Sequence, residues 1–209
     1  MSKRVRSATM AIAIMARAPA AGAVKTRLIP RLGAEGAAAL HARLVLHAVA
    51  TAVAAGLGKV TLWCTPDRHD PFFAACAADF GVELRTQPRG DLGERMLATF
   101  WSRSPQLLIG ADCPALAPEH LREAAEILER QEAVFLPAED GGYVLIGLRR
   151  PIYALFTKIE WGVDTVMDET RKRLVEHSLS WSEPTVLWDV DRPEDYERLV
   201  REGLFQGIS

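Results

Sequence analysis

Short apolar runs alternate with longer helical stretches along this sequence, and this alternation limits the fold classes open to it. The apolar runs are rich in β-branched residues or leucine and are bounded by turn residues, as expected of buried strands. Strands are predicted over residues 9–16, 60–64, 107–109, 133–136, 143–148 and 185–188. Helices are predicted over residues 34–55, 72–80, 92–101, 165–176 and 193–201. Such alternation predicts an α/β fold with a mostly parallel central sheet flanked by helices.

The length and composition suit one domain with a sizeable core. The chain has 209 residues, of which 49% are hydrophobic and 25% are charged, and this is the balance of a globular protein. We find no internal repeat, linker or change in composition that marks a second domain. The prediction is therefore a disordered tail over residues 1–8 and a single domain over residues 9–209.

Charge and cysteine content exclude several classes of partner. The formal net charge of −2 provides no basic field for nucleic acid. Cys64, Cys76 and Cys113 form no CxxC pair, so we expect free thiols and a cytoplasmic, reducing location. The apolar run at residues 8–16 follows a basic start but leads directly into Arg17, and no other stretch reads as long enough to cross a bilayer. We therefore expect neither a signal peptide nor insertion into a membrane.

A glycine-bearing loop follows the first predicted strand and gathers three cationic side chains. Backbone NH groups and cations in such a loop suit a chain of phosphates. The GxxxxGK[ST] spacing of a P-loop is absent, and a solvated basic loop is the alternative interpretation. The candidate phosphate-binding residues are Arg17, Pro19, Gly22, Lys25, Thr26 and Arg27.

Carboxylates follow two later strands. Asp112 comes just after the predicted strand 107–109, and Asp189 and Asp191 alternate after the strand 185–188. Ligands of open α/β sheets bind beyond the carboxyl ends of strands, so Asp112 is expected to face the ligand. Asp189 and Asp191 would share a face. Since carboxylate oxygens are the ligands that Mg²⁺ prefers, all three are candidate metal ligands. Helix capping is the alternative for Asp112 and Asp191.

Two further motifs combine glycines with polar side chains. The segment Asp140-Gly141-Gly142-Tyr143 would let backbone approach a ligand, although a plain hairpin turn would use the same glycines. The second motif is the segment 87–96, which lies between a strand and a helix. In this segment, helix capping by Asp91 is as plausible as ligand binding. Its candidate ligand-binding residues are Gly90, Asp91, Glu94 and Arg95.

Other catalytic motifs are missing from the sequence. The five histidines lie in no zinc spacing, and those within predicted helices, such as His41 and His47, are expected at the surface. GxSxG, HExxH and GxGxxG are all absent, which argues against hydrolase triads, zinc enzymes and dinucleotide oxidoreductases.

Taken together, these motifs resemble those of a bacterial family of uncharacterised, glycosyltransferase-like proteins. That family has the Rossmann-like GT-A fold of the nucleotide-diphospho-sugar transferases and is distantly similar to phospholactate and molybdenum-cofactor guanylyltransferases. The resemblance extends in order from near residue 10 almost to the end of the chain. It implies a nucleotide at the carboxyl ends of the first strands, and a metal held at the positions of Asp112 and Asp191. The opening loop lacks the GGxGxRM pattern of better-known nucleotidyltransferases, so the resemblance does not specify the base.

The leading hypothesis is nucleotidyl transfer from a nucleoside triphosphate to a phosphorylated small molecule. Lys25, Arg17 and Arg27 would bind the phosphates, and Asp112 with Asp191 would hold Mg²⁺ or Mn²⁺. A phosphate acceptor is already anionic and needs no general base. Glycosyl transfer from a nucleotide-sugar is the close rival, and a non-catalytic nucleotide-binding protein is the third alternative. The acceptor is not identified, and a homodimer is left open.

Overall fold

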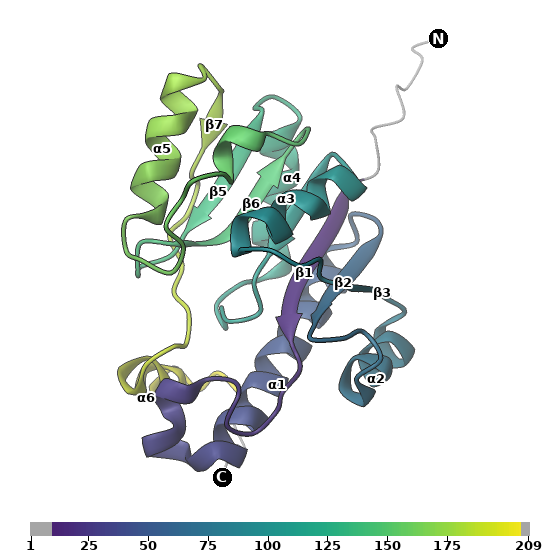
Figure 1. The fold of residues 1–209 in the computed structure, drawn as a ribbon, viewed down its shortest axis with the longest axis vertical. Coiled ribbons are helices and arrows are strands. Elements are labelled where there is room, and N and C mark those ends of the chain that lie inside the picture. Colours follow the sequence, from purple (N-terminus) through teal and green to yellow (C-terminus); the bar gives the residue numbers. More distant parts are fainter. Residues whose placement is uncertain (1–9, 206–209) are drawn as a thin grey trace.

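The computed structural model describes residues 10–205, and its centre is one seven-stranded sheet (Figure 1). The strand order is β3-β2-β1-β4-β6-β5-β7. The strands are β1 (Ala11–Arg17), β2 (Val60–Thr65), β3 (Glu83–Thr86), β4 (Gln106–Ile109), β5 (Ala133–Pro137), β6 (Tyr143–Leu148) and β7 (Trp181–Ser182). The helices are η1 (Thr26–Leu28), α1 (Ile29–Ala55), α2 (Pro71–Phe80), α3 (Leu92–Ser102), α4 (Pro118–Leu128), η2 (Tyr153–Leu155), α5 (Val166–Glu176) and α6 (Pro193–Arg201).

Strand direction determines where the functional loops gather. β1 pairs in parallel with both β2 and β4, and β2 pairs in parallel with β3. β6 is antiparallel to β4 and to β5, so β5 again runs in the direction of β4. The carboxyl ends of β1, β2, β4 and β5 therefore meet at one edge of the sheet. The predicted α/β fold with a mostly parallel sheet is confirmed.

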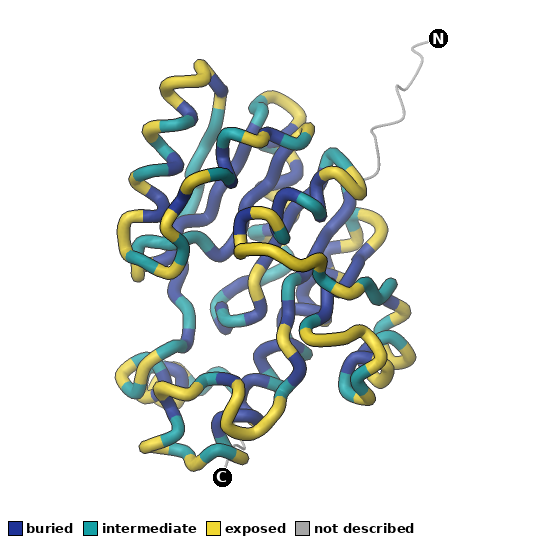
Figure 2. Tube along the Cα trace, in the orientation of Figure 1, coloured by how far each residue is buried: buried dark blue, intermediate teal, exposed yellow. Residues whose placement is uncertain are grey.

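Alternate residues of the strands face two separate apolar cores, one on each side of the sheet. In β1, Ile12 and Ile14 pack into the core beneath α1, α2 and α4, whereas Ala13 faces the core beneath α3, η2 and α5. This is the period-two pattern of a strand covered on both faces. Figure 2 shows the central strands β1, β2, β4, β5 and β6 largely buried between helices with exposed outer surfaces. A third cluster, formed around Leu40, Leu44 and Tyr196, joins α1 to α6.

Helix α1 is longer than predicted and begins at Ile29 with a break at Gly33, whose φ of 71° is left-handed. It ends at Ala55 and is capped by Gly56, whose φ of 67° is left-handed, as glycine readily allows. The stretch Thr26–Ala55 is long and apolar enough to cross a membrane by length and composition alone, contrary to the expectation that no such stretch exists. In this structure 56% of its most apolar window is buried, because Val45, Val49 and their neighbours pack on the sheet. The composition is explained by its place in the core.

Several elements differ from the sequence-based prediction. Residues 185–188 do not form a strand; only an isolated bridge joins Leu187 to Ala138, and the short β7 lies earlier in the chain. Strand β3 was not predicted, and its four residues are only partly buried. Helix α4 was not among the predicted helices, and it was implied only by the alternative that Asp112 caps a helix. The predicted tail, residues 1–8, lies outside the described residues.

The three cysteines are free and buried, as expected. Burial raises the pKa of Cys64 and Cys113 to about 12 and that of Cys76 to about 11. These thiols remain protonated at neutral pH and behave as small apolar core residues.

Gly147 in β6 provides a direct test of core packing. A Cβ atom there would lie 2.6 Å from Val134 Cγ1 and 2.7 Å from Leu107 Cδ2. Gly147→Ala is therefore expected to lower the free energy of unfolding by about 1–3 kcal/mol, since overpacked cores must shift. Urea denaturation measures the change. Gly110→Ala is the control, because a Cβ there meets no atom within 4 Å; equal losses in both variants would contradict the described packing.

Candidate functional site

The candidate site lies at the edge where the carboxyl ends of the parallel strands meet. The loop after β1 enters it from one side, and the loop after β4 carries Asp112. Three backbone hydrogen bonds attach the late segment 187–191 to this edge. Leu187 N donates to Pro137 O, Glu139 N donates to Leu187 O, and Val190 N donates to Asp112 O, each at 2.9 Å. Asp189 and Asp191 are thereby positioned beside loops that come much earlier in the chain.

Lys25 occupies the centre of the site. Its backbone is left-handed, with φ 47° and ψ 41°, at the start of η1, and its side chain is only 4% exposed. The ammonium group lies 2.5 Å from Asp112 Oδ1 and 2.9 Å from Asp191 Oδ1. One buried cation thus bridges two carboxylates from different loops.

Within this triad, the neighbouring charges shift the pKa values of Lys25 and Asp191. Burial alone would lower the pKa of Lys25, but Asp112 and Asp191 outweigh that effect and the pKa is raised. Burial would raise the pKa of Asp191, yet Lys25 and Arg27 hold that pKa below its usual value. Lys25 and Asp191 are therefore both charged at neutral pH.

Helix capping does not account for the two paired aspartates. Helix α4 begins after Ala117, and Asp112 takes no part in its start. At the start of α6, Asp195 Oδ2 accepts from the backbone NH groups of Asp191 and Arg192 at 3.0 and 2.7 Å. The side chain of Asp191 remains directed at Lys25.

An outer cleft of about 540 Å³ surrounds this triad, and several cationic side chains line it. Arg17, Lys25, Thr26, Arg27 and Arg95 line it. Arg27 lies 3.4 Å from Asp191 Oδ2 with a side chain that is 64% exposed. Within residues 10–205, neither Arg17 nor Arg95 has a carboxylate oxygen within 4 Å. These guanidinium groups are available to an anion in the cleft.

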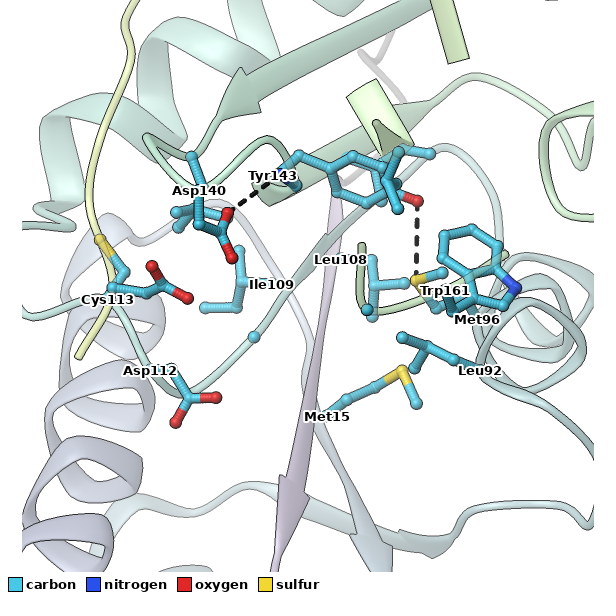
Figure 3. Close-up of a pocket in the computed structure, with 18 of the residues that line it drawn as sticks. Met15, Leu92, Met96, Leu108, Ile109, Asp112, Cys113, Asp140, Tyr143 and Trp161 are labelled. Carbon is cyan, nitrogen blue, oxygen red and sulfur yellow. Dashed lines mark hydrogen bonds between the residues drawn. The ribbon is translucent and has the colours of Figure 1, made fainter. Parts of the chain in front are cut away.

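An inner cavity of about 320 Å³ adjoins the outer cleft and has a different character. Figure 3 shows Asp112 and Asp140 on one side of it, facing Met15, Leu92 and other apolar side chains. Asp112, Asp140 and Gly162 line both spaces. The two spaces together form one cleft with a cationic outer part and an apolar inner part.

Asp189 lines the inner cavity, whereas Asp191 lines the outer cleft. Burial, reinforced by the neighbouring charges of Asp140, Asp191 and Asp112, raises the pKa of Asp189 to about 7. Among residues 10–205, no three His, Cys, Asp or Glu side chains come together as a ready metal site. The structure thus does not gather Asp112, Asp189 and Asp191 into one ligand group.

The residues nevertheless fit a divalent cation in a more limited way. Asp112 and Asp191 direct oxygens at a single point, which the ammonium of Lys25 occupies. Mg²⁺ is commonly held by one or two carboxylates and completes its coordination with water and substrate phosphates. Two carboxylates are sufficient for such a site once the ammonium has moved.

The turn Asp140-Gly141-Gly142 is closed largely by the chain itself. Asp140 Oδ1 accepts from Gly142 N at 2.9 Å. Gly141 has a φ of 90°, and a Cβ there would lie 1.8 Å from the backbone oxygen of Asp164. The close approach that requires this glycine is therefore to the chain's own segment. Asp140, Gly142 and Tyr143 line the inner cavity, and burial raises the pKa of Tyr143.

The Gly90–Arg95 motif serves mainly to start helix α3. Asp91 Oδ1 accepts from Glu94 N at 2.8 Å, and Asp91 N donates to Glu94 Oε2 at 2.9 Å, which is a capping box. Arg95 Nε donates to the carbonyl of Gly90 at 3.0 Å, and Arg95 also lines the outer cleft. Pro19 and Gly22 belong to the loop that delivers Lys25, where Gly22 has a φ of 78°.

His41 is a site residue that sequence reasoning missed, because it was expected at the surface of a helix. It is 6% exposed, its Nε2 lies 2.9 Å from Arg17 O, and its Nδ1 lies 3.8 Å from Asp112 Oδ1. His47 is half-buried on the same helix and bonds to Leu116 O at 3.0 Å. In the sequence, the long apolar stretch around both histidines was the available signal that this helix is buried on several sides.

The half-buried His47 predicts a pH dependence of stability. Burial lowers the pKa of His47, with the bond to Leu116 O acting in the opposite direction. An unfolded chain takes up this proton near pH 6.5, so the stability contribution is present above that pH and is lost as pH falls through the lower folded pKa.

His47→Gln should therefore weaken the decline in the free energy of unfolding between about pH 7 and pH 5. Urea denaturation at a series of pH values measures it. His69→Gln at an exposed position is the control and should leave the decline unchanged. An identical decline in wild type and His47→Gln would show that His47 titrates normally in the folded protein.

Comparison with known proteins identifies relatives of this fold. Residues 48–163, more than half of the chain, match the family described as "Uncharacterized protein conserved in bacteria (DUF2064)". None of the curated proteins matches the sequence. A structure from Desulfovibrio desulfuricans G20, described as a proposed nucleotide-diphospho-sugar transferase, is similar with a TM-score of 0.85 and 26% identity, covering 96% of this chain and 90% of that one.

Two more distant structures share the fold alone. A cytidylyltransferase from Leptospira borgpetersenii has a TM-score of 0.60 at 16% identity, covering 92% of this chain and 85% of its own. A nucleotidyl transferase from Methanothermobacter has a TM-score of 0.57 at 14% identity, covering 95% and 99%. These three structures are named as a nucleotide-diphospho-sugar transferase, a cytidylyltransferase and a nucleotidyl transferase.

Proposed function

Because the chain belongs to the DUF2064 family and has a cationic cleft beside paired carboxylates, we propose that it is a metal-dependent transferase that uses a nucleotide. The proposed reaction is nucleotidyl transfer from a nucleoside triphosphate to a phosphorylated small molecule. The observation that supports it most is the gathering of Arg17, Lys25 and Arg27 around Asp112 and Asp191. A triphosphate brings the high negative charge that such a cleft would neutralise.

The cations and the paired carboxylates of the outer cleft each have a role in this proposal. Arg17, Arg27 and Arg95 bind phosphate oxygens, and Arg17 is held in place through its carbonyl by His41. The side chain of Lys25 moves, so that its ammonium group leaves the carboxylates and contacts the phosphates. Asp112 and Asp191 would hold Mg²⁺ or Mn²⁺, which neutralises charge on the phosphates when bound. The acceptor phosphate is the nucleophile, so catalysis consists of positioning and charge neutralisation.

The inner cavity is the proposed place for the body of the acceptor. It lies at the other side of Asp112 and is lined by Tyr143, Met96 and Trp161. Its mixed apolar and acidic lining contrasts with the cationic outer cleft, so the phosphate of the acceptor would remain outside it. We also propose a cytoplasmic location, supported by three free, buried thiols.

Glycosyl transfer from a nucleotide-sugar is the second candidate. One observation favours it: the Desulfovibrio structure at 26% identity is described as a proposed nucleotide-diphospho-sugar transferase. The same cleft would then bind a diphosphate, with the sugar in the inner cavity. A protein that binds nucleotides without turnover is the third alternative. Release of pyrophosphate or of a nucleoside diphosphate distinguishes the first two.

The proposed function predicts metal-dependent binding of a nucleotide. At a concentration about a hundredfold above Kd, a triphosphate should stabilise the folded protein by about 2.7 kcal/mol, which raises Tm by roughly 5–10 °C for a chain of this size. A thermal-shift screen of nucleoside triphosphates and nucleotide-sugars, with and without Mg²⁺, measures this.

Asp112→Asn should abolish the metal-dependent part of the shift. Asp79→Asn, at an exposed position on α2, is the matched control and should keep it. Shifts only with nucleotide-sugars would favour glycosyl transfer. The absence of a shift with every nucleotide would contradict the proposed function.

A further inference from the structure

The triad of Lys25, Asp112 and Asp191 places a positive charge at the point where a divalent cation would bind. The distances of 2.5 and 2.9 Å leave no room for a metal ion between the ammonium and the carboxylates. Asp112 and Asp191 are 43% and 42% exposed, whereas the Lys25 side chain is 4% exposed. The carboxylates are thus reachable from the cleft, but their shared position is already taken.

A metal ion could not simply join this arrangement. A divalent cation beside a buried ammonium would create repulsion in a region of reduced dielectric. If the metal took both carboxylates, Lys25 would be left buried without a counter-charge, which is strongly unfavourable. Metal binding therefore requires the ammonium to find a new anion.

We propose that Lys25 is an internal counter-cation that keeps Asp112 and Asp191 closed to divalent metal until a polyphosphate draws it away. The release step rests on the proposed function, whereas the closure does not. In this account the nucleotide brings its phosphates to the cleft before, or together with, the metal. The protein therefore binds metal ion poorly on its own.

The surroundings of Lys25 support such an exchange. Arg17, Arg27 and Arg95 line the same cleft, so a bound polyphosphate would lie close to the ammonium. Lysine has a flexible four-carbon stem and can redirect its charge without movement of the backbone. The preceding loop, residues 20–23, is exposed.

His41 is a second, independent sign that the position beside Asp112 is built for an ion. It is more than nine-tenths buried, and its Nδ1 is directed at Asp112 Oδ1 from 3.8 Å without a hydrogen-bond partner of its own within the described chain. Its Nε2 is held by the carbonyl of Arg17. The ring is thus fixed in place with one free nitrogen toward the carboxylate that Lys25 would vacate.

The test of closure needs no nucleotide. Mn²⁺ binding to the purified full chain is measured by electron paramagnetic resonance in wild type, Lys25→Met and Arg27→Met. Lys25→Met should bind Mn²⁺ at least about tenfold more tightly than wild type, because it opens the carboxylate pair. Arg27→Met is the matched control: its side chain is 64% exposed, so the change should be no more than about threefold.

Lys25→Gln repeats the measurement in case Lys25→Met does not fold, since it keeps polar donors without the charge. Circular dichroism and Tm establish folding of each variant. Equal Mn²⁺ affinity in wild type and the Lys25 variants would overturn the inference. The same conclusion follows if Arg27→Met gains as much Mn²⁺ affinity as Lys25→Met. The gain would then come from the loss of any positive charge near the site, and not from the loss of the ammonium that occupies the carboxylate pair.

Release is tested separately with inorganic tripolyphosphate as the probe. The chain has five lysines, so their side-chain NMR signals are few, and Lys25→Met assigns the one from Lys25. Tripolyphosphate without metal should shift the Lys25 signal while leaving those of Lys59 and Lys172 in place. A shift of all signals alike, or of none, would overturn the release step. Failure of nucleotide binding with a positive Mn²⁺ result would contradict the proposed function and leave closure intact.

Discussion

The ammonium group of Lys25 joins three segments that lie far apart in the sequence. It comes from the loop after β1 and reaches Asp112 after β4 and Asp191 before α6. Because the side chain is almost completely buried, removing it would leave two carboxylates facing each other, and removing either carboxylate would weaken the balance of a buried charge. The geometry of the outer cleft depends on this ion pair.

The fold supports that ion pair from several directions. Parallel strands bring the loops after β1 and β4 to one edge of the sheet. The bond from Val190 N to the carbonyl of Asp112 fixes the late segment there. Asp195 caps α6 and so leaves Asp191 free for Lys25. His41 reaches the same point from the long helix α1 and ties it to the end of β1. Core packing and site geometry are therefore coupled through α1.

Much of this arrangement could be predicted from the sequence, for identifiable reasons. Apolar runs followed by helical stretches revealed most of the strands. Because ligands of open α/β sheets bind beyond the carboxyl ends of strands, Lys25, Asp112 and Asp191 were predicted to lie in one site. The segment 185–188 was predicted wrongly because Leu187 meets the chain after β5 through an isolated bridge to Ala138, and the sheet is not extended. The pairing of Lys25 with both carboxylates arises from tertiary contacts that no local sequence pattern encodes. For the burial of His41, the long apolar stretch around it was the one local signal. Likewise Gly141 is required by its approach to Asp164, a residue far from it in the chain.

The central claim is that the point between Asp112 and Asp191 exchanges the ammonium of Lys25 for a metal ion when a nucleotide binds. A crystal structure with Mn²⁺ and a non-hydrolysable nucleoside triphosphate, with the metal located by anomalous scattering, tests it most directly. The account predicts Mn²⁺ bound by Asp112 and Asp191, with Lys25 Nζ moved onto the phosphates. Mn²⁺ and nucleotide bound while Lys25 still bridges both carboxylates, or nucleotide bound outside the cleft, would contradict it.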